Sequence, residues 1–335
     1  MIATAEIGSL TAACGDSLRH SARLSPPKTW LHRLWVVMVF VNVIVPVVLV
    51  AGVGFLFGRC TKLGTVFLTK LSFYVLSPAL IFHSLISHSI AASDLTSTVV
   101  FVAIVFCSLL ALSLLGTRLL GWDKDTRIAS VLSLCLNNNG NYGLPILLFA
   151  FGEVGFALGV VYMVTQMAFV VVFGIGAASW EKGMSVRKLL VSILKVPWFY
   201  AFALALLVRT FSIGLPLPVL RPIELLAQAA IPVQLLLLGM ALSTVRIEGL
   251  IRKASLLTAA KLFIPPLLAW GVAAALGLDG LLRAVVIVQA STPTAVNALI
   301  LSLQYKRRPQ LTATVVLLST VGNLATMSVL LELLR

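Results

Sequence analysis

The chain has 335 residues, of which 60% are hydrophobic and only 11% are charged, whereas a soluble domain carries about 25% charged residues. This balance, with a mean hydropathy of +1.07, excludes a water-soluble fold and predicts an all-α polytopic membrane protein in a lipid bilayer. The net charge of +14 comes from short basic runs between apolar segments. That pattern is typical of membrane topology and argues against a nucleic-acid partner.

Motifs for metal binding or catalysis are missing from the sequence. The four cysteines are scattered and no CxxC pair occurs, so we expect neither a metal site nor a disulfide framework. The chain also has no nucleophile motif, no HExxH and no phosphate-binding GxxxxGK(S/T). We therefore do not expect an enzyme, nor a pump that this chain alone drives with nucleotides.

The first 35 residues differ from the rest of the chain. Residues 1–35 are polar and basic, which predicts a disordered tail. The apolar run after the tail is too long for a signal-peptide core and has no clear cleavage site. One hypothesis is that Met38 is the true start of the native protein, and N-terminal sequencing would test it.

Ten apolar segments follow, each about 20 residues or more in length, as the core of a bilayer requires of a helix. Lys and Arg gather in the odd-numbered loops between them, so the positive-inside rule places those loops in the cytoplasm and both termini outside. The basic tail disagrees with this orientation. The predicted spans are 36–58, 63–88, 95–120, 127–151, 154–179, 190–213, 218–243, 253–277, 281–304 and 310–334.

The fourth span is interrupted by residues 137–145, Asn-Asn-Asn-Gly-Asn-Tyr-Gly-Leu-Pro. Irregular polar backbone at membrane depth is tolerated only where protein buries it or water reaches it. A half-helix that begins there offers free amides and a positive dipole end to an anion. The alternative is a structural role, in which these amides only form hydrogen bonds between packed helices. The candidate substrate-binding residues are Asn137, Asn138, Asn139, Asn141, Tyr142 and Pro145.

Lys261 lies about two turns into the eighth span, four residues before Pro265. A buried cation is costly, so this residue is a candidate for the substrate site. Alternatively, its long side chain snorkels to the cytoplasmic interface. Three further polar residues in apolar runs either line a cavity or pack between helices, namely Gln166, Gln234 and Asn323.

The ninth span is interrupted in the same way, by Ser-Thr-Pro-Thr at residues 291–294. Its proline also removes a helical hydrogen bond and frees backbone groups for a ligand. Hydroxyl and amide side chains on both sides of the proline add neutral donors and acceptors. The candidate residues in this second break are Gln289, Thr292, Pro293, Thr294 and Asn297.

An ordered series of matches indicates an internal repeat. Because each half holds five spans, an odd number, the two halves must face opposite ways across the bilayer. Inverted repeats with broken helices near the midplane are typical of secondary transporters. The predicted halves are 36–180 and 190–335, joined by a short cytoplasmic loop at 181–189. The matched residues are Pro46 with Pro197, Pro78 with Pro232, Asp123 with Asp279, Arg127 with Arg283 and Asn137 with Pro293.

The Asn-rich Gly-Leu-Pro break, the Ser-Thr-Pro break and the segments 71–82 and 293–305 together resemble the auxin efflux carrier family and its prokaryotic members. The resemblance covers residues from about 38 to 335. It implies a ten-helix fold in which spans four and nine cross at their prolines. It also implies a scaffold of spans 1, 2, 6 and 7, a mobile transport unit of spans 3–5 and 8–10, and a homodimer through the scaffold.

We therefore expect a secondary transporter, a permease or efflux carrier, that moves a small organic anion such as a carboxylate by alternating access. Its membrane is the plasma membrane or a bacterial inner membrane. The plant carriers' long central loop is missing, so their substrate is not carried over. No resident cofactor is expected, although a coupling Na⁺ or H⁺ is compatible with the breaks. The alternatives are a sodium-coupled symporter of the related bile acid type and a non-transporting membrane receptor or scaffold.

Overall fold

The computed structural model describes residues 38, 40–61, 63–179, 191, 194–245 and 250–334. These residues form helices and no strands, apart from one isolated bridge between Asn137 and Thr294. The predicted tail at 1–35 and the predicted loop at 181–189 lie outside the described residues.

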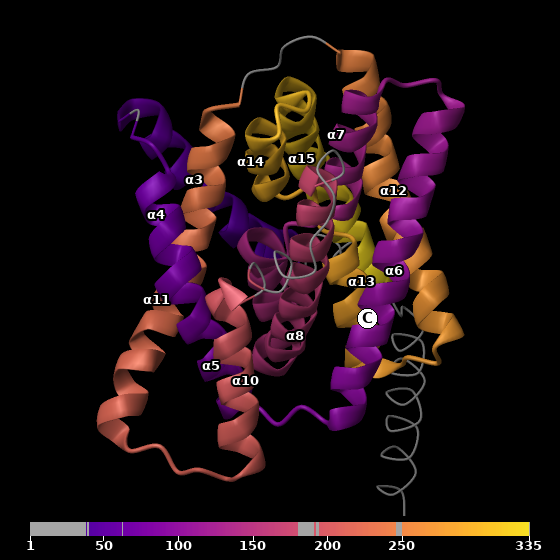
Figure 1. The fold of residues 1–335 in the computed structure, drawn as a ribbon. Coiled ribbons are helices and arrows are strands. Elements are labelled where there is room, and N and C mark those ends of the chain that lie inside the picture. The colour runs from indigo at the N-terminus through magenta and orange to yellow at the C-terminus, as the bar shows by residue number, and fades with distance from the viewer. Residues whose placement is uncertain are drawn as a thin grey trace, which may run out of the picture.

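The first half of the described chain runs from η1 to α8 (Figure 1). Short π-helical turns, labelled η, precede or interrupt three of the helices. The elements are η1 (Phe40–Ile44), α3 (Val45–Thr61), α4 (Val66–Leu71), η2 (Ser72–Leu76), α5 (Ser77–Ser87), α6 (Ala92–Leu119), α7 (Lys124–Cys135), η3 (Asn139–Gly143) and α8 (Leu144–Ser179).

The second half contains six described helices, and α13 and α14 are short because the second break separates them. The elements are α10 (Pro197–Thr210), α11 (Leu217–Ser243), α12 (Ile251–Ala275), α13 (Gly280–Ala290), α14 (Val296–Gln304) and α15 (Pro309–Leu333). Across the described residues, seven helical stretches are long and apolar enough to cross a membrane, and α10 and α13 are shorter apolar helices.

The predicted boundary between spans four and five falls at a kink in the structure. The range labelled α8 (Leu144–Ser179) holds two helices that meet at Gly152, where the backbone is not helical. Gly152 has φ 66° and ψ −164°, a conformation that only glycine adopts without steric cost. A single glycine therefore makes the turn that the sequence placed at residues 151–154.

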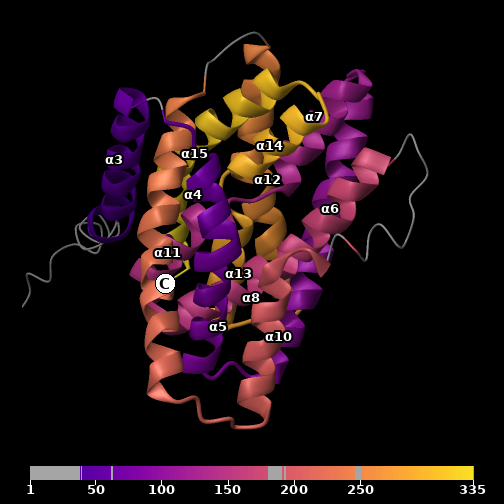
Figure 2. The same ribbon diagram turned by 60° about the vertical axis from the view of Figure 1, so that its left-hand side comes forward.

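Two groups of helices pack within the molecule. In one group α3, α5, α10 and α11 contact one another, and in the other α6, α7, α8, α12, α13 and α15 do so. In Figure 2, α3 and α11 stand at the left and α5 and α10 at the lower end, with α12 and α13 in the centre and α6 at the right. The two breaks lie in the second group, and their cavity faces the first.

Small residues bring α3 and α11 into close contact. Gly54 and Gly58 are spaced as in the GxxxG pattern that lets membrane helices approach closely. An added Cβ at Gly54 would overlap the backbone of Leu236, and one at Gly239 would overlap the Ala51 carbonyl. Backbone packing of this kind holds α3 tightly against α11, whose Gln234 and Leu237 line the larger cavity.

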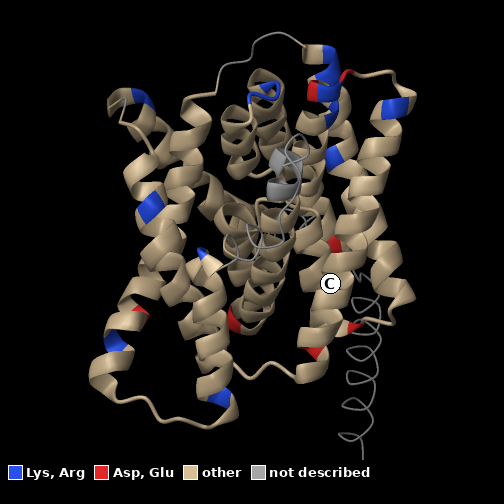
Figure 3. Cartoon of the chain, in the orientation of Figure 1, with Lys and Arg blue, Asp and Glu red and all other residues tan. Residues whose placement is uncertain are grey.

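Charged side chains lie mostly toward the ends of the helices, and many Lys and Arg gather at the upper end in Figure 3. At that end Arg307 forms a 2.5 Å ion pair with Asp125, and Arg308 lies 3.4 Å from Asp123. Lys253 stacks over the Trp122 ring at 5.4 Å. These contacts tie the start of α7 to the α14–α15 turn and to α12.

Candidate functional site

The two helix breaks lie directly against each other. After α7 ends at Cys135 the chain is extended, and so is the chain between α13 and α14. The Asn138 N–H donates to the Pro293 carbonyl at 2.9 Å, and the Ala295 N–H donates to the Leu136 carbonyl at 2.9 Å. Each break therefore satisfies backbone groups that the other leaves free, as membrane depth requires.

Only one of the two prolines lies at this crossing. Pro293 takes part through its carbonyl, but Pro145 is the second residue of α8 and lies beyond the π-helical turn η3. The expectation that the two helices cross at both prolines is therefore wrong. Proline is well tolerated in the first turn of a helix, where its missing N–H costs no bond, so Pro145 starts α8 instead of forming the crossing.

The carboxyl-terminal end of α7 is capped by side chains from three different elements. Thr294 Oγ1 donates to the Ser133 carbonyl at 2.8 Å. Lys261 Nζ donates to the Leu134 carbonyl, and Gln166 Nε2 donates to the Cys135 carbonyl, both at 3.0 Å. The last carbonyls of a helix have no partner within it, so these bonds replace the missing turn.

The end of α13 is capped from the first break. Asn137 Nδ2 donates to the carbonyls of Ala290 at 3.0 Å and Gln289 at 3.4 Å. Asn137 Oδ1 in turn accepts a hydrogen bond from Lys261 Nζ. The Lys261 side chain is only 1% exposed, which rules out the alternative that it snorkels to the interface.

A second layer of polar contacts locks the two breaks together. Asn139 Nδ2 donates to Gln166 Oε1, and Asn139 Oδ1 accepts from Thr292 Oγ1 at 3.0 Å. Gln289 Nε2 donates to the Gly159 carbonyl at 3.3 Å. Gln289 also fills the space beside Gly143, where an added Cβ would overlap its side-chain oxygen.

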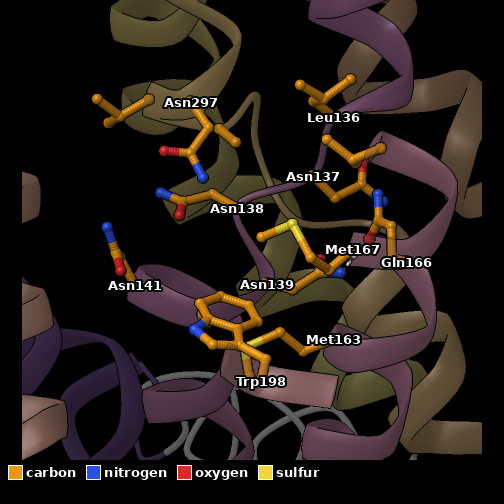
Figure 4. A pocket seen from close by; sticks show the side chains of 14 residues that line it. Leu136, Asn137, Asn138, Asn139, Asn141, Met163, Gln166, Met167, Trp198 and Asn297 are labelled. Carbon is orange, nitrogen blue, oxygen red and sulfur yellow. Dashed lines mark hydrogen bonds between the residues drawn. The ribbon is translucent and has the colours of Figure 1, made fainter. Parts of the chain in front are cut away.

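The amino-terminal ends of the following half-helices face a different environment, because they border two neighbouring cavities of about 70 and 220 Å³. Gly140 and Asn141 at the start of η3 line both cavities, as do Val296 and Asn297 at the start of α14. Figure 4 shows the amides of Asn138, Asn141 and Asn297 on the left side of the smaller cavity, with the Trp198 ring below them.

The amides that face the cavity are largely free of protein partners. Asn138 is 5% exposed, and its Nδ2 has no hydrogen-bond partner among the residues that the structure describes. Asn141 is half-buried and Asn297 is exposed at the cavity edge. Within the described part of the chain no charged residue lines either cavity, and no cluster of three or more His, Cys, Asp or Glu could hold a metal ion.

The predicted site residues thus separate into two sets. Those that line a cavity are Asn137, Asn138, Asn139, Asn141 and Asn297. The others contribute to neither cavity wall. Tyr142 and Pro145 are buried in η3 and at the start of α8, and the remaining residues are buried around the crossing: Lys261, Gln289, Thr292, Pro293 and Thr294. The assignment of the first set to substrate binding remains a prediction.

Several wall residues come from parts of the chain that the sequence did not single out. Trp198 of α10 lines both cavities, and its Nε1 donates to the Phe73 carbonyl at 3.0 Å. Thr65, Thr69 and Ser72 line the larger cavity. These three residues are spaced by four and three positions, which places them on one face of a helix. That polar face in an apolar segment could have been recognised in the sequence.

The structure shows whether Gln166, Gln234 and Asn323 line a cavity or pack between helices. Gln166 and Gln234 both line a cavity and pack between helices, because Gln234 Nε2 also donates to Ser77 Oγ at 3.2 Å. Asn323 lines neither cavity, and its Nδ2 donates to the Ser291 carbonyl at 2.9 Å. Asn323 therefore joins α15 to the second break.

Comparison with known proteins places this architecture in a family. A family model described as membrane transport protein matches residues 38–331. A relative from Methanothermobacter thermautotrophicus, described as an uncharacterized transporter, is 24% identical over 208 residues, which cover 62% of this chain and 68% of the relative. Since the family model matches most of the chain, the protein is an integral membrane transporter and belongs to the membrane transport protein family, the auxin efflux carrier family that its motifs indicate.

Proposed function

We propose that the protein is a secondary transporter of a small organic anion, such as a carboxylate, which binds in the cavity beside the crossing. The observation that carries this proposal is that two half-helices begin at one cavity. The first amides of a helix have no acceptor within it, and its amino-terminal end carries roughly +0.5 of a charge. Two such ends, at η3 and α14, border both cavities.

The side chains of the wall complement these backbone ends. Asn138 Nδ2 is a buried donor with no protein partner, and leaving a buried donor unsatisfied costs about 1–3 kcal/mol. A carboxylate oxygen would satisfy it. The lining within the described residues holds no Asp or Glu to repel such a ligand.

The rest of the wall suits the organic part of the ligand. Met163, Met167 and Val170 line the smaller cavity beside the Trp198 ring. Binding sites for small molecules combine an apolar wall with a few polar groups that fix orientation. The larger cavity adds the hydroxyls of Thr69 and Ser72, which suit additional polar substituents on the ligand.

For the mechanism we propose alternating access between the two helix groups. In this proposal the group of α3, α5, α10 and α11 is the scaffold, and the group that holds both breaks is the transport unit. The ten spans would form two inverted halves, with the end that carries the α14–α15 turn in the cytoplasm and both termini outside. A homodimer would form through the scaffold.

The test is a change of charge in the cavity. Asn141→Asp keeps the shape of the side chain but adds a negative charge where we place the substrate. We first identify a bound carboxylate by thermal shift of the purified protein against a panel of mono- and dicarboxylates, and then measure its uptake into proteoliposomes. We expect Asn141→Asp to weaken that binding at least about tenfold, since like charges at close range cost more than about 1.4 kcal/mol.

Gln310→Glu is the matched control, because it adds the same charge at the exposed start of α15, away from both cavities. It should bind and transport like the wild type. Unchanged carboxylate binding by Asn141→Asp, or tighter binding of a cation by the wild type than of any carboxylate, would refute the anion assignment. Binding without flux in proteoliposomes would instead favour the receptor alternative.

A further inference from the structure

Lys261 lies in the middle of α12 with an exposed fraction of 1%. A buried ammonium is expensive unless nearby groups compensate its charge. Among the described residues no carboxylate lies against it, and its two hydrogen bonds go to neutral oxygens, the Leu134 carbonyl and Asn137 Oδ1. Nor does Lys261 line either cavity, so it is not placed to contact a substrate there.

Both oxygens lie at the carboxyl-terminal end of α7, and the Asn137 side chain also reaches the end of α13. The Leu134 carbonyl is one of the last four of α7, and Asn137 itself caps the carboxyl-terminal end of α13. Each such end carries roughly −0.5 of a charge. The ammonium of Lys261 therefore contacts the negative end of α7 directly and lies one amide group away from the negative end of α13.

Such a position suits a bound cation in transporters with broken helices. There, unwound carbonyls and the carboxyl-terminal ends of half-helices coordinate the coupling Na⁺, while the amino-terminal ends face an anionic substrate. Here the amino-terminal ends face the cavities, the carboxyl-terminal end of α7 binds Lys261, and that of α13 is linked to Lys261 through Asn137. The carbonyl and amide oxygens that Lys261 binds are also of the type that hard cations prefer.

We propose that the Lys261 ammonium is a tethered cation that occupies the position of a coupling sodium ion. The crossing is then held together without Na⁺, and flux of the anion does not depend on a sodium gradient. The statement about flux rests on the proposed function, whereas the statement about the cation position does not. Lys261 is therefore a positioning residue: it holds Asn137 and the end of α7 in place and does not contact the substrate itself.

The test measures thermal stability of the purified full chain in NaCl and in choline chloride at equal ionic strength. The wild type should have the same melting temperature in both salts. Lys261→Ala leaves two unpaired oxygens and a space, so its melting temperature in choline should fall by about 5 °C. Sodium should restore at least half of that loss and saturate with concentration, because Na⁺ can enter the space.

Two variants separate a cation site from mere packing. Lys261→Met keeps the volume of the stem but carries no charge, so it should be destabilised in both salts and gain nothing from sodium. Lys253→Ala removes a lysine from the same helix outside the crossing, where it stacks on Trp122, and should show no specific response to sodium.

The proposal is overturned if sodium stabilises the wild type, if Lys261→Ala responds equally to both salts, or if Lys261→Met is as stable as the wild type. If Lys261→Ala can be purified only in sodium, that recovery is itself the expected rescue, and failure in both salts counts against the proposal. Because no substrate is used, the result is independent of the anion assignment. Conversely, failure of the Asn141→Asp test leaves the melting temperatures unaffected.

Discussion

The two helix breaks share polar composition and a proline, but the structure uses them differently. In the first break, Asn138 and Asn141 turn amides toward the cavity, and Asn138 Nδ2 has no protein partner. In the second break the hydroxyls of Ser291, Thr292 and Thr294 are buried and bonded: Thr292 and Thr294 donate to Asn139 and Ser133 across the crossing, and Ser291 donates back to Ile287 of α13. One break is free to bind a ligand, while the other mostly holds the crossing together.

This difference follows from where each polar group finds its partner. Buried polar groups in a membrane protein are normally satisfied within the protein. An amide that remains unsatisfied therefore indicates a site for a ligand or water, while a fully bonded hydroxyl indicates a structural role. The comparison predicts that substitutions in the first break affect transport and those in the second affect stability.

The largest effect is expected from Asn138→Ala. The Asn138 side chain has no protein partner at Nδ2, so its loss should leave the melting temperature almost unchanged. Transport of the bound anion should fall roughly tenfold to a hundredfold, because a hydrogen bond to a charged group contributes about 1.5–3 kcal/mol. Uptake into proteoliposomes and thermal unfolding of the same preparation measure both quantities.

The control for this prediction is Asn139→Ala in the same break. Its side chain is bonded to Gln166 and Thr292, so this variant should lose stability as well as transport. If Asn138→Ala unfolds as readily as Asn139→Ala, the distinction between free and bonded amides in the first break is wrong.

Next in size is the effect of Gly143→Ala, which tests the contact between the breaks. An added Cβ would overlap Gln289 Oε1 and lie 2.9 Å from Thr292 Cγ2. Overpacking of this kind costs about 1–3 kcal/mol, and denaturant or thermal unfolding should detect it. Gly140→Ala is the matched control, because its Cβ would meet only Met163 Sδ at 3.3 Å. Equal stability of the two variants would count against a tight fit at Gly143.

A somewhat smaller loss is expected from Thr294→Val in the second break. The substitution keeps the shape but removes the donor to the Ser133 carbonyl, and an unsatisfied buried carbonyl costs about 1–3 kcal/mol. Thr320→Val is the control, since Thr320 Oγ1 donates within its own helix to Val316, a carbonyl that keeps its backbone partner. The two variants should differ in melting temperature, and Thr294→Val should bind the anion normally once folded.

The smallest effect concerns the matched aspartates at which the two broken helices begin. Asp123 accepts from the Thr126 N–H at 2.8 Å, whereas Asp279 makes no side-chain cap bond. Asp123→Ala should therefore cost about 1 kcal/mol, as loss of a helix cap does, and Asp279→Ala almost nothing. Thermal unfolding of the two variants checks this contrast, and equal losses would contradict it.

This cap should also depend on pH. Hydrogen bonds from the Thr126 backbone and hydroxyl lower the pKa of Asp123 below its ordinary value. A carboxyl whose pKa is lowered by folding stabilises the protein above its unfolded pKa, about 3.9 for Asp. This contribution is lost as the pH falls through the lower folded pKa. The stability difference between the wild type and Asp123→Ala should therefore vanish in acid.

Much of the broken-helix site could be located from the sequence, because polar residues and prolines stand out in apolar spans. Residues 137–145 and 291–294 were both identified in this way. The predicted spans at 63–88, 218–243 and 310–334 agree with the observed helices within a few residues. The error at Pro145 arose because a proline can either break a helix or begin one, and the sequence does not distinguish the two.

The walls of the cavity could not be predicted in the same way. Trp198, Thr69 and Ser72 are unexceptional in their own segments, and only packing of α4 and α10 near the breaks brings them to the cavity. Lys261 was recognised as unusual, but the sequence left open whether it reached the interface or the break. Its two hydrogen bonds at the end of α7 decide that question.

The sequence by itself determined that the chain spans a membrane, where its helices are interrupted and which residues at the interruptions are polar. These properties depend on the hydrophobicity of each segment and on the backbone geometry of proline and glycine. Both are local and do not depend on how the helices pack. Only the tertiary structure decided which polar groups are satisfied, since a hydrogen bond across the crossing joins residues more than 150 positions apart. The separation of free amides at the cavity from bonded groups around Lys261 is therefore a property of the fold.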